Sequence, residues 1–225
     1  KMIDLHTHST ISDGALTPKQ LVQAAAQNGC RLLALTDHDH TGGLAEARAE
    51  AARHGIRFIN GAEISVTWRH RTLHIVALDF DEHNSRLQTL LAQVRQGRIA
   101  RLHQIAAKLA KHGIAGAAEG ALALAANPAM VSRTHIADWL VQQGHARTKQ
   151  QAFTRYLGDG KRASVRHQWA ELPAVIAAIQ AAGGIAVIAH PMRYDLSATA
   201  RRNLFDEFRA LGGQGMEVHS GSCSL

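Results

Sequence analysis

The chain has 225 residues, 46% of them hydrophobic but only 4% aromatic, so one sizeable domain with a core of small aliphatic side chains is expected. No apolar run approaches the ~20 residues of a membrane span, and neither a secretory leader nor a disulfide framework is visible, which favours a cytoplasmic protein. The formal net charge of +7 favours polyanionic partners, such as nucleotides, nucleic acid or anionic lipid, without choosing among them.

The first part of the chain alternates short apolar runs with amphipathic segments. The runs predict strands at Met2–Leu5, Arg31–Thr36, Ile56–Ile59, Ile64–Trp68 and Leu73–Leu78. Thr17 and Pro18 are the N-cap and first residue of a predicted helix, and a second helix is expected over Gly43–His54. Strands that alternate with helices of this length indicate parallel βαβ units.

The later part of the chain resumes this pattern after a helical interruption. The final elements predicted are a helix at Leu172–Ala182, a strand at Ile185–Ala189, a helix at Leu204–Leu211 and a strand that begins at Met216–Val218. In the interruption we expect helices at Ser85–His112, Val131–Gln143 and Lys149–Leu157, and a loop at Gly113–Ala129. The sequence thus predicts an α/β domain of residues 1–100 and 162–225, with residues 101–161 as a basic helical insertion.

Histidines and carboxylates gather where the predicted strands end. They are His6, His8 and Asp13 after the first strand, Asp37 and His38 after the second, Glu63 after the third, His74 in the strand that follows, and His190 after Ile185–Ala189. Because the carboxyl ends of parallel strands meet at one edge, these side chains are expected to lie together. Side chains alternate along a strand, so His6 and His8 point to the same side and can grip one cation. Imidazoles mixed with carboxylates suit a transition metal better than Ca²⁺ or Mg²⁺.

Each of these residues also has a structural interpretation. A single histidine at a strand end is more often hydrogen-bonded within the fold than bound to metal, Asp37 and Asp39 are of a type that caps helices, and Glu63 could be a surface charge. Their joint recurrence favours the ligand interpretation, since burying so many ionisable groups without a metal is costly. Asp37 is predicted to orient a ligand histidine. A Ser/His/Asp triad built on Ser9 or Ser12 is disfavoured, because neither serine lies in a Gly-x-Ser-x-Gly turn.

The motifs Asp-Leu-His-Thr-His-Ser, Leu-Thr-Asp-His-Asp, Gly-Ala-Glu-Ile and Ala-His-Pro, in this order, resemble the PHP (polymerase and histidinol phosphatase) family. The resemblance implies a distorted (β/α)₇ TIM-like barrel with up to three divalent transition metals, foremost Mn²⁺ and otherwise Zn²⁺ or Fe²⁺. By position it assigns one metal to His6, His8 and Glu63, a second to Asp13 and His38, and a third to Glu63, His74 and His190. A hydroxide held by this ligand set would attack phosphorus in line.

The sequence departs from the family pattern near its end. The family has a late Gly-Ser-Asp-x-His element that supplies an Asp and a His, and this sequence ends at Leu225 without one. We therefore expect a chain cut short before those two ligands, with His219 as a weak substitute.

The helical insertion resembles that of a bacterial branch of the family. Members of that branch release the 3′-phosphate of nucleoside 3′,5′-bisphosphates, leaving the 5′-monophosphate, and some trim RNA from its 5′ end. The resemblance implies that Arg133 and His135 bind substrate, and Arg193, with Lys161 and Arg162 more weakly, is a similar candidate. A helix N-cap with a solvated arginine is the alternative for this segment.

The expected substrate is a nucleotide or a short oligonucleotide, with neither a membrane nor an obligate protein partner. A 5′-to-3′ exonuclease, a histidinol phosphatase and a non-catalytic metal-binding PHP module remain the alternatives to the bisphosphate phosphatase.

Overall fold

The computed structural model describes residues 2–218, and the contacts within the chain divide it into two compact units. One unit consists of the segments up to Val94 and from Gln168 onward, and the other is Arg95–His167. The predicted insertion, residues 101–161, lies inside the second unit, which begins six residues earlier and ends six residues later. None of the helices in the described part of the chain combines the length and hydropathy that a bilayer crossing requires.

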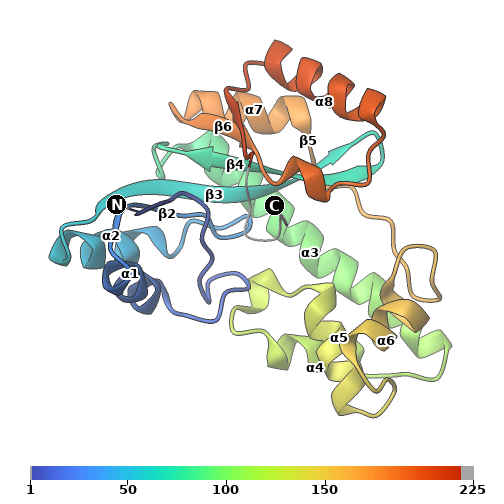
Figure 1. Ribbon diagram of the computed structural model, residues 1–225. Helices are drawn as coiled ribbons and strands as arrows, with labels where there is room; N and C mark the ends of the chain where they lie inside the picture. Colours follow the sequence, from blue (N-terminus) through green and yellow to red (C-terminus); the bar gives the residue numbers. More distant parts are fainter. Residues whose placement is uncertain (1, 219–225) are drawn as a thin grey trace. The chain divides into compact units, whose positions relative to one another are not determined.

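The first unit is built on a curled, mixed sheet that forms a half-barrel (Figure 1). Its strands are β1 (Met2–Asp4), β2 (Cys30–Leu35), β3 (Arg57–Trp68), β4 (Arg71–Leu78), β5 (Ala170–Glu171), β6 (Ile185–Ile188) and β7 (Gly215–Met216). Their order is β1-β2-β3-β4-β6-β7, and β5 pairs with the end of β3 along the edge opposite to β4. Among the described residues β1 and β7 are the edge strands, and each presents apolar side chains to solvent: Ile3 is 63% exposed and Met216 is 47% exposed.

The parallel pairing indicated for the βαβ units does not extend to β4, which runs antiparallel to both β3 and β6. The turn between β3 and β4 has only two residues, Arg69 and His70, and both have positive φ, as a type I′ hairpin requires. The two strands predicted at Ile56–Ile59 and Ile64–Trp68 are one strand of 12 residues. The first part of β3 pairs with β2, and the part beyond Asn60 pairs with β4.

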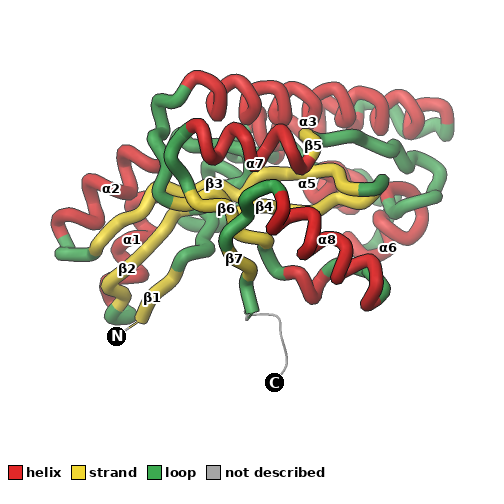
Figure 2. Tube along the Cα trace, turned by 90° about the horizontal axis from the view of Figure 1, so that it is seen from above, coloured by secondary structure: helices red, strands yellow, loops and turns green. Residues whose placement is uncertain are grey.

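The first unit also contains helices α1 (Pro18–Gln27), α2 (Leu44–Arg53), α7 (Leu172–Ala181) and α8 (Ala198–Ala210), together with the N-terminal part of α3 (Ser85–Lys111) (Figure 2). The N-cap prediction for α1 is confirmed, since Thr17 and Gln20 form a reciprocal capping box. Helix α8 begins six residues before the predicted start at Leu204, because Ser197 caps it ahead of a first turn that carries few apolar residues. Apolar side chains from β3 and β4, among them Ile64 and Ile75, pack with these helices in one core.

The second unit is helical. It contains the C-terminal part of α3 (Ser85–Lys111), then α4 (Ala117–Leu124), a 3₁₀ turn at Pro128–Met130, α5 (Arg133–Gln142), and α6 (Lys149–Ala152), which continues as a π-helical turn over Phe153–Leu157. The predicted loop at Gly113–Ala129 is therefore wrong in its middle, where α4 lies. Helix α4 packs on α5 through Gly120, where an added Cβ would lie only 1.9 Å from Nε1 of Trp139. Because a glycine, and not a large apolar residue, lies at this contact, the helical spacing of apolar residues that would predict α4 is weak in the sequence.

Candidate metal centre

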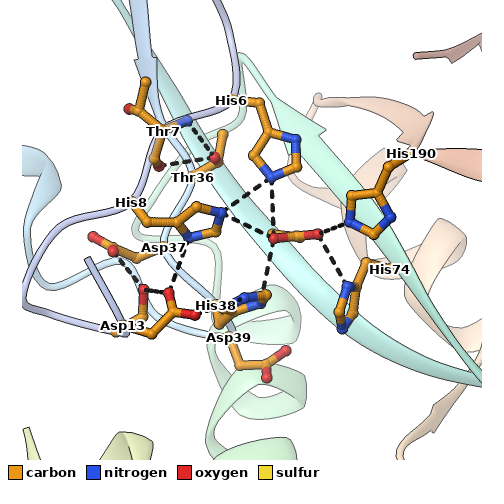
Figure 3. A network of polar contacts seen from close by, with 12 residues as sticks. His6, Thr7, His8, Asp13, Thr36, Asp37, His38, Asp39, His74 and His190 are labelled. Atoms are coloured by element: carbon orange, nitrogen blue, oxygen red, sulfur yellow. Dashed lines mark hydrogen bonds and ion pairs between the residues drawn. The ribbon is translucent and has the colours of Figure 1, made fainter. Parts of the chain in front are cut away.

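The carboxylate of Glu63 lies at the centre of the site and is 1% exposed. It projects from the middle of β3, level with the end of β2, where His38 bridges to it. Its two oxygens face different imidazoles (Figure 3). Oε2 lies 3.1 Å from Nε2 of His6, 3.1 Å from Nε2 of His8 and 3.3 Å from Nδ1 of His38. Oε1 lies 3.0 Å from Nδ1 of His74 and 2.8 Å from Nε2 of His190. One carboxylate thus joins two groups of histidines.

The two histidines after β1 point the same way, as alternation along an extended segment predicts. Thr7 between them faces β2, where its amide and hydroxyl bond to Thr36 and the Ala34 carbonyl. The Nε2 atoms of His6 and His8 lie only 3.1 Å apart. The segment is therefore fixed to β2 on one side and presents both imidazoles on the other.

Buried aspartates hold the loops that carry the ligands. Asp37 accepts hydrogen bonds from the amide and hydroxyl of Ser9 and from the hydroxyl of Ser12, at 2.6–2.7 Å. Its described contacts are therefore with the loop after His8 rather than with the ligand histidine that it is predicted to orient. Asp39, in a left-handed conformation with φ of 50°, accepts from the amide and hydroxyl of Ser65, which fixes the loop after β2 against β3.

Asp13 extends the cluster on one side. Its oxygens lie 3.6 Å from Nδ1 of His8 and 3.6 Å from Nε2 of His38, and its side chain is 56% exposed. The hydrogen bond with His38 and the charge of that imidazole hold the pKa of Asp13 well below its usual range, against a smaller opposing effect of burial. Asp13 is thus ionised and can share a cation with both histidines.

The last two imidazoles come from β4 and from the turn after β6. Because β4 is reversed, His74 near its start lies beside the carboxyl end of β6, close to His190. His190 has a strained backbone, with φ of 29° and ψ of 58°. Tyr194 supports both residues: its hydroxyl accepts from the amide of His74 at 2.9 Å, and its ring packs edge-on against His190.

Glu217, just after β7, is a member of the site that sequence reasoning missed. Its Oε1 lies 2.5 Å from Nδ1 of His6, and its Oε2 accepts from the amide of His190 at 2.7 Å. It follows the short apolar run Gly-Met with no recognised motif, so the only available signal was its place at a strand end. His219, the weak candidate, lies outside the described residues.

The donor set fits divalent metal ions. Three groups have ligand atoms all within 4.8 Å of one another: His6, His8 and Glu63; His8, Asp13 and His38; and His38, Glu63 and His74. Within the described structure, Nδ1 of His8, His38 and His74 is buried but makes no hydrogen bond, although each lies near a carboxylate. When it is unprotonated, such a buried ring nitrogen would offer its lone pair to a cation shared with the neighbouring carboxylate.

The charges of the site also require a cation. Burial alone would raise the pKa of Glu63, but interactions with the imidazoles of His190, His6, His74 and His8 hold it well below the usual range. Burial alone would lower the pKa of His6, but hydrogen bonds and charges from Glu217 and Glu63 raise it from 6.5 to about 10. In the absence of a metal, a proton on His6 therefore supplies the positive charge that the carboxylates demand.

The family model described as "PHP domain" matches residues 4–181. The chain belongs to the PHP domain family.

Two named relatives of this PHP protein are similar to it over nearly the whole length of the chain. A 3′,5′-nucleoside bisphosphate phosphatase of Chromobacterium violaceum is 51% identical over 99% of the chain and 78% of the relative. A 5′-3′ exoribonuclease of Haemophilus influenzae is 47% identical over 97% of the chain and 79% of the relative. A solved structure from Bifidobacterium adolescentis, whose assignment as a metal-dependent phosphoesterase is itself a prediction, is 29% identical with a TM-score of 0.82 over 97% of the chain and 78% of its own. This PHP protein is a metal-dependent phosphoesterase, and hence an enzyme.

The residues expected to bind substrate lie in both units. In the helical unit, Nη1 of Arg133 lies 3.3 Å from Asp159 and donates to the carbonyl of Leu157 at 3.2 Å, so its guanidinium is held in place. His135 occupies the third position of α5, where its Nδ1 accepts from the amide of Ser132 and completes a capping box. Ser132 is thus the N-cap of α5, but Arg133 contacts Leu157 and Asp159 and is not the solvated arginine of the N-cap alternative.

Arg193 belongs to the other unit. It ends a 3₁₀ turn at Pro191–Arg193, three residues after His190. Its amide donates to the carbonyl of His190 at 2.9 Å, which ties the turn to a predicted ligand.

Proposed function

We propose that this PHP protein hydrolyses the 3′-phosphate ester of nucleoside 3′,5′-bisphosphates, so that adenosine 3′,5′-bisphosphate yields AMP. The observation that carries the proposal is the buried Glu63 carboxylate between two groups of imidazoles, a site able to hold adjacent cations. The 51% identity to a 3′,5′-nucleoside bisphosphate phosphatase supports the choice of substrate. We also infer Mn²⁺ as the working metal, with Zn²⁺ or Fe²⁺ as alternatives, and a cytoplasmic location.

The residues of the chain divide the work of this reaction. His6, His8, Asp13, His38, Glu63, His74 and His190 would hold up to three ions, which generate the nucleophile at neutral pH and neutralise the phosphoryl oxygens when bound. Asp37 fixes the loop that carries His8 and Asp13. Glu63 stays ionised because its imidazole neighbours favour the charged form, so it does not donate a proton during the reaction.

We further propose that Arg133, His135 and Arg193 bind substrate phosphates, and that the helical unit acts as a substrate lid. A guanidinium pairs with two phosphate oxygens at once, which a lysine cannot do. Arg133→Lys should therefore raise KM for the bisphosphate roughly tenfold, with a smaller change in kcat. An unchanged KM would argue against a role in binding.

The finer fold is also proposed. The exposed apolar side chains on β1 and β7, such as Ile3 and Met216, support a half-barrel that belongs to a distorted (β/α)₇ barrel.

The test is phosphate release from adenosine 3′,5′-bisphosphate by protein loaded with Mn²⁺. Elemental analysis confirms the metal content, and chromatography identifies the nucleoside product. We expect AMP, with little release from AMP itself or from histidinol phosphate. Absence of release from a demonstrably metal-loaded protein would refute the proposal, and faster release from histidinol phosphate would favour that alternative.

A second candidate, a 5′-to-3′ exoribonuclease, is favoured by the distribution of charge. Twelve of the 25 Lys and Arg residues but only three of the 18 Asp and Glu residues lie in Arg95–His167. The helical unit therefore carries a formal charge of +9, while the remainder of the chain carries −2. A charge of this size suits a polyanion longer than a mononucleotide. Comparing kcat/KM for the bisphosphate and for a short 5′-phosphorylated RNA separates the two candidates.

A further inference from the structure

Glu217 is held in one place by the sheet. Its amide donates to the carbonyl of Ile188, the last residue of β6, at 3.0 Å. Its carboxylate is mostly buried, with 16% of the side chain exposed. Both of its oxygens are engaged, one by His6 and the other by His190. These two residues are 211 and 27 positions away in the sequence, so the side chain joins distant parts of the site.

The contact with His6 concerns the ring nitrogen that faces away from the cluster. Nε2 of His6 faces Glu63 and His8, whereas Nδ1 faces Glu217 at 2.5 Å. A carboxylate at Nδ1 accepts the N–H there and so leaves the lone pair on Nε2. Glu217 thus selects the tautomer of His6 that can ligate a metal through Nε2.

The contact with His190 concerns its backbone. His190 has a left-handed backbone conformation, which residues other than glycine rarely adopt without support. The hydrogen bond from its amide to Oε2 of Glu217 supports this conformation at 2.7 Å. In that conformation Nε2 of His190 lies 2.8 Å from Oε1 of Glu63. Glu217 therefore also directs an imidazole that faces Oε1 of Glu63, whereas His6 faces Oε2.

We propose that Glu217 is a positioning residue that couples the two groups of histidines, by orienting the ring of His6 and the backbone of His190 with one carboxylate. The proposal rests on the metal-dependent function proposed above and assigns the residue a role in metal affinity. Both oxygens must act as acceptors, because each faces an N–H group. Glutamine fills the same space but has one acceptor and one donor, so it cannot replace glutamate.

The test compares Glu217→Gln and Glu217→Ala with the parent protein in metal titrations without substrate. Outer carboxylates of this kind typically change metal affinity 10–100-fold, so we expect a loss of about that size in both variants. Activity should return at high Mn²⁺ concentration, since the ligands themselves remain. Zn²⁺-loaded protein offers a spectroscopic check: the Nδ1–H signal of His6 in long-range ¹H–¹⁵N spectra should shift or broaden in Glu217→Gln.

The control is Glu207→Gln, which removes a carboxylate that accepts from Trp68 in the same unit, outside the metal cluster. It should change the unfolding temperature without changing metal affinity. If Glu217 only fills space, Glu217→Gln will bind metal like the parent protein while Glu217→Ala binds it poorly, and the proposal is wrong. Loss of one metal ion that no excess restores would instead make Glu217 a direct ligand and overturn the positioning role. Because the titration needs no substrate, a failed phosphatase assay does not affect its outcome.

Discussion

At the scale of the residue, the site depends on how one buried carboxylate is compensated. Glu63 is almost inaccessible to water, and an isolated charge there would cost several kcal/mol of desolvation. Five imidazoles surround it, but neutral imidazoles supply only dipoles. Divalent cations held by Glu63 and these histidines would compensate the charge and would accept the lone pairs of the buried ring nitrogens.

Glu63→Gln should weaken metal binding and lower activity, because it removes the charge that attracts the cations. The amide keeps the shape of the side chain but loses the charge and one acceptor oxygen. We expect bound metal to fall by at least one ion per chain and kcat/KM to fall at least ~1000-fold, equivalent to about 4 kcal/mol of transition-state stabilisation. Elemental analysis and phosphate release measure the two effects. The exposed Glu46→Gln, outside the metal cluster, serves as the control, and a variant that kept more than a tenth of the activity would contradict the prediction.

Metal removal should make stability depend on pH through His6. The pKa of His6 in the folded, metal-free protein is raised from 6.5 to about 10, chiefly by Glu217 and Glu63 acting against burial. The proton therefore binds more tightly to the folded chain than to the unfolded chain. Its stabilising contribution is full below pH about 6.5 and is lost as the pH rises through about 10. Urea unfolding of chelator-treated protein should give a lower free energy of unfolding at pH about 9.5 than at about 6.5.

The metal-loaded protein provides the comparison for this experiment. With a metal in place of the proton, the decrease between these two pH values should be absent. A chelated protein whose stability stays constant or rises over the same range would show that His6 does not hold the proton.

The sequence predicted most of the residues that the structure brings together, because their types and positions follow local rules. His6 and His8 share a face through alternation, and Glu63, His74 and His190 could be placed near strand ends. Glu217 could not be predicted, since its role depends on partners 211 and 27 residues away. The contacts of Asp37 with Ser9 and Ser12 were likewise invisible, because the loop after β1 has no periodic pattern that would place its serines.

At the scale of the element, periodicity found the strands but not their directions. The expectation of parallel pairing came from the alternation of strands with helices, and β4 follows β3 without a helix. Two residues suffice to reverse the chain, so a hairpin was the physical alternative. The apolar runs before and after Asn60–Glu63 appeared as two strands because polar Asn60 and Glu63 interrupt the pattern, while the backbone continues through them. Functional side chains thus disguised the length of the strand.

Helix α4 shows why small residues weaken prediction and yields its own test. Gly120→Ala should destabilise the helical unit by about 1–3 kcal/mol, because the new Cβ would collide with the ring of Trp139 on α5. This cost exceeds the gain of up to ~1 kcal/mol expected from replacing glycine with alanine in a helix. Chemical denaturation measures the difference, with Ala123→Ser at an exposed position of α4 as the control. A stabilised Gly120→Ala protein would show that α4 and α5 do not pack closely there.

At the scale of the whole molecule, the net charge of +7 is the sum of two unlike parts. The helical unit, at +9, accounts for more than the total, and the unit with the metal cluster is slightly acidic. The acidic contribution includes Asp13 and Glu63 of the candidate metal centre. Composition alone predicted a polyanionic partner but gave no location for it, because the asymmetry appears only when the chain is divided into its units.

This asymmetry predicts a salt dependence that differs between substrates. The affinity for a short 5′-phosphorylated RNA should fall steeply between about 50 and about 200 mM salt, since each neutralised phosphate releases counterions. The bisphosphate should show a shallower slope. Lys161→Gln with Arg162→Gln should reduce the slope for RNA by about 1–2 and leave that for the bisphosphate nearly unchanged. Fluorescence anisotropy measures RNA binding, and equal slopes for both ligands would argue against an extended polyanion on the helical unit.

The two-residue turn between β3 and β4 acts as a spacer whose length is part of the function. It pairs Trp68 with Arg71 and so sets His74 opposite Ser65, on the face that carries Glu63. One additional residue in the turn would move β4 by one place, rotate His74 into the aliphatic core and turn a core residue such as Ile75 toward the metals. Substitutions of Arg69 and His70 alter only local strain and charge, whereas insertions there change which face of the strand meets the site. Among variants of this protein, the turn can therefore tolerate changes of composition far better than changes of length.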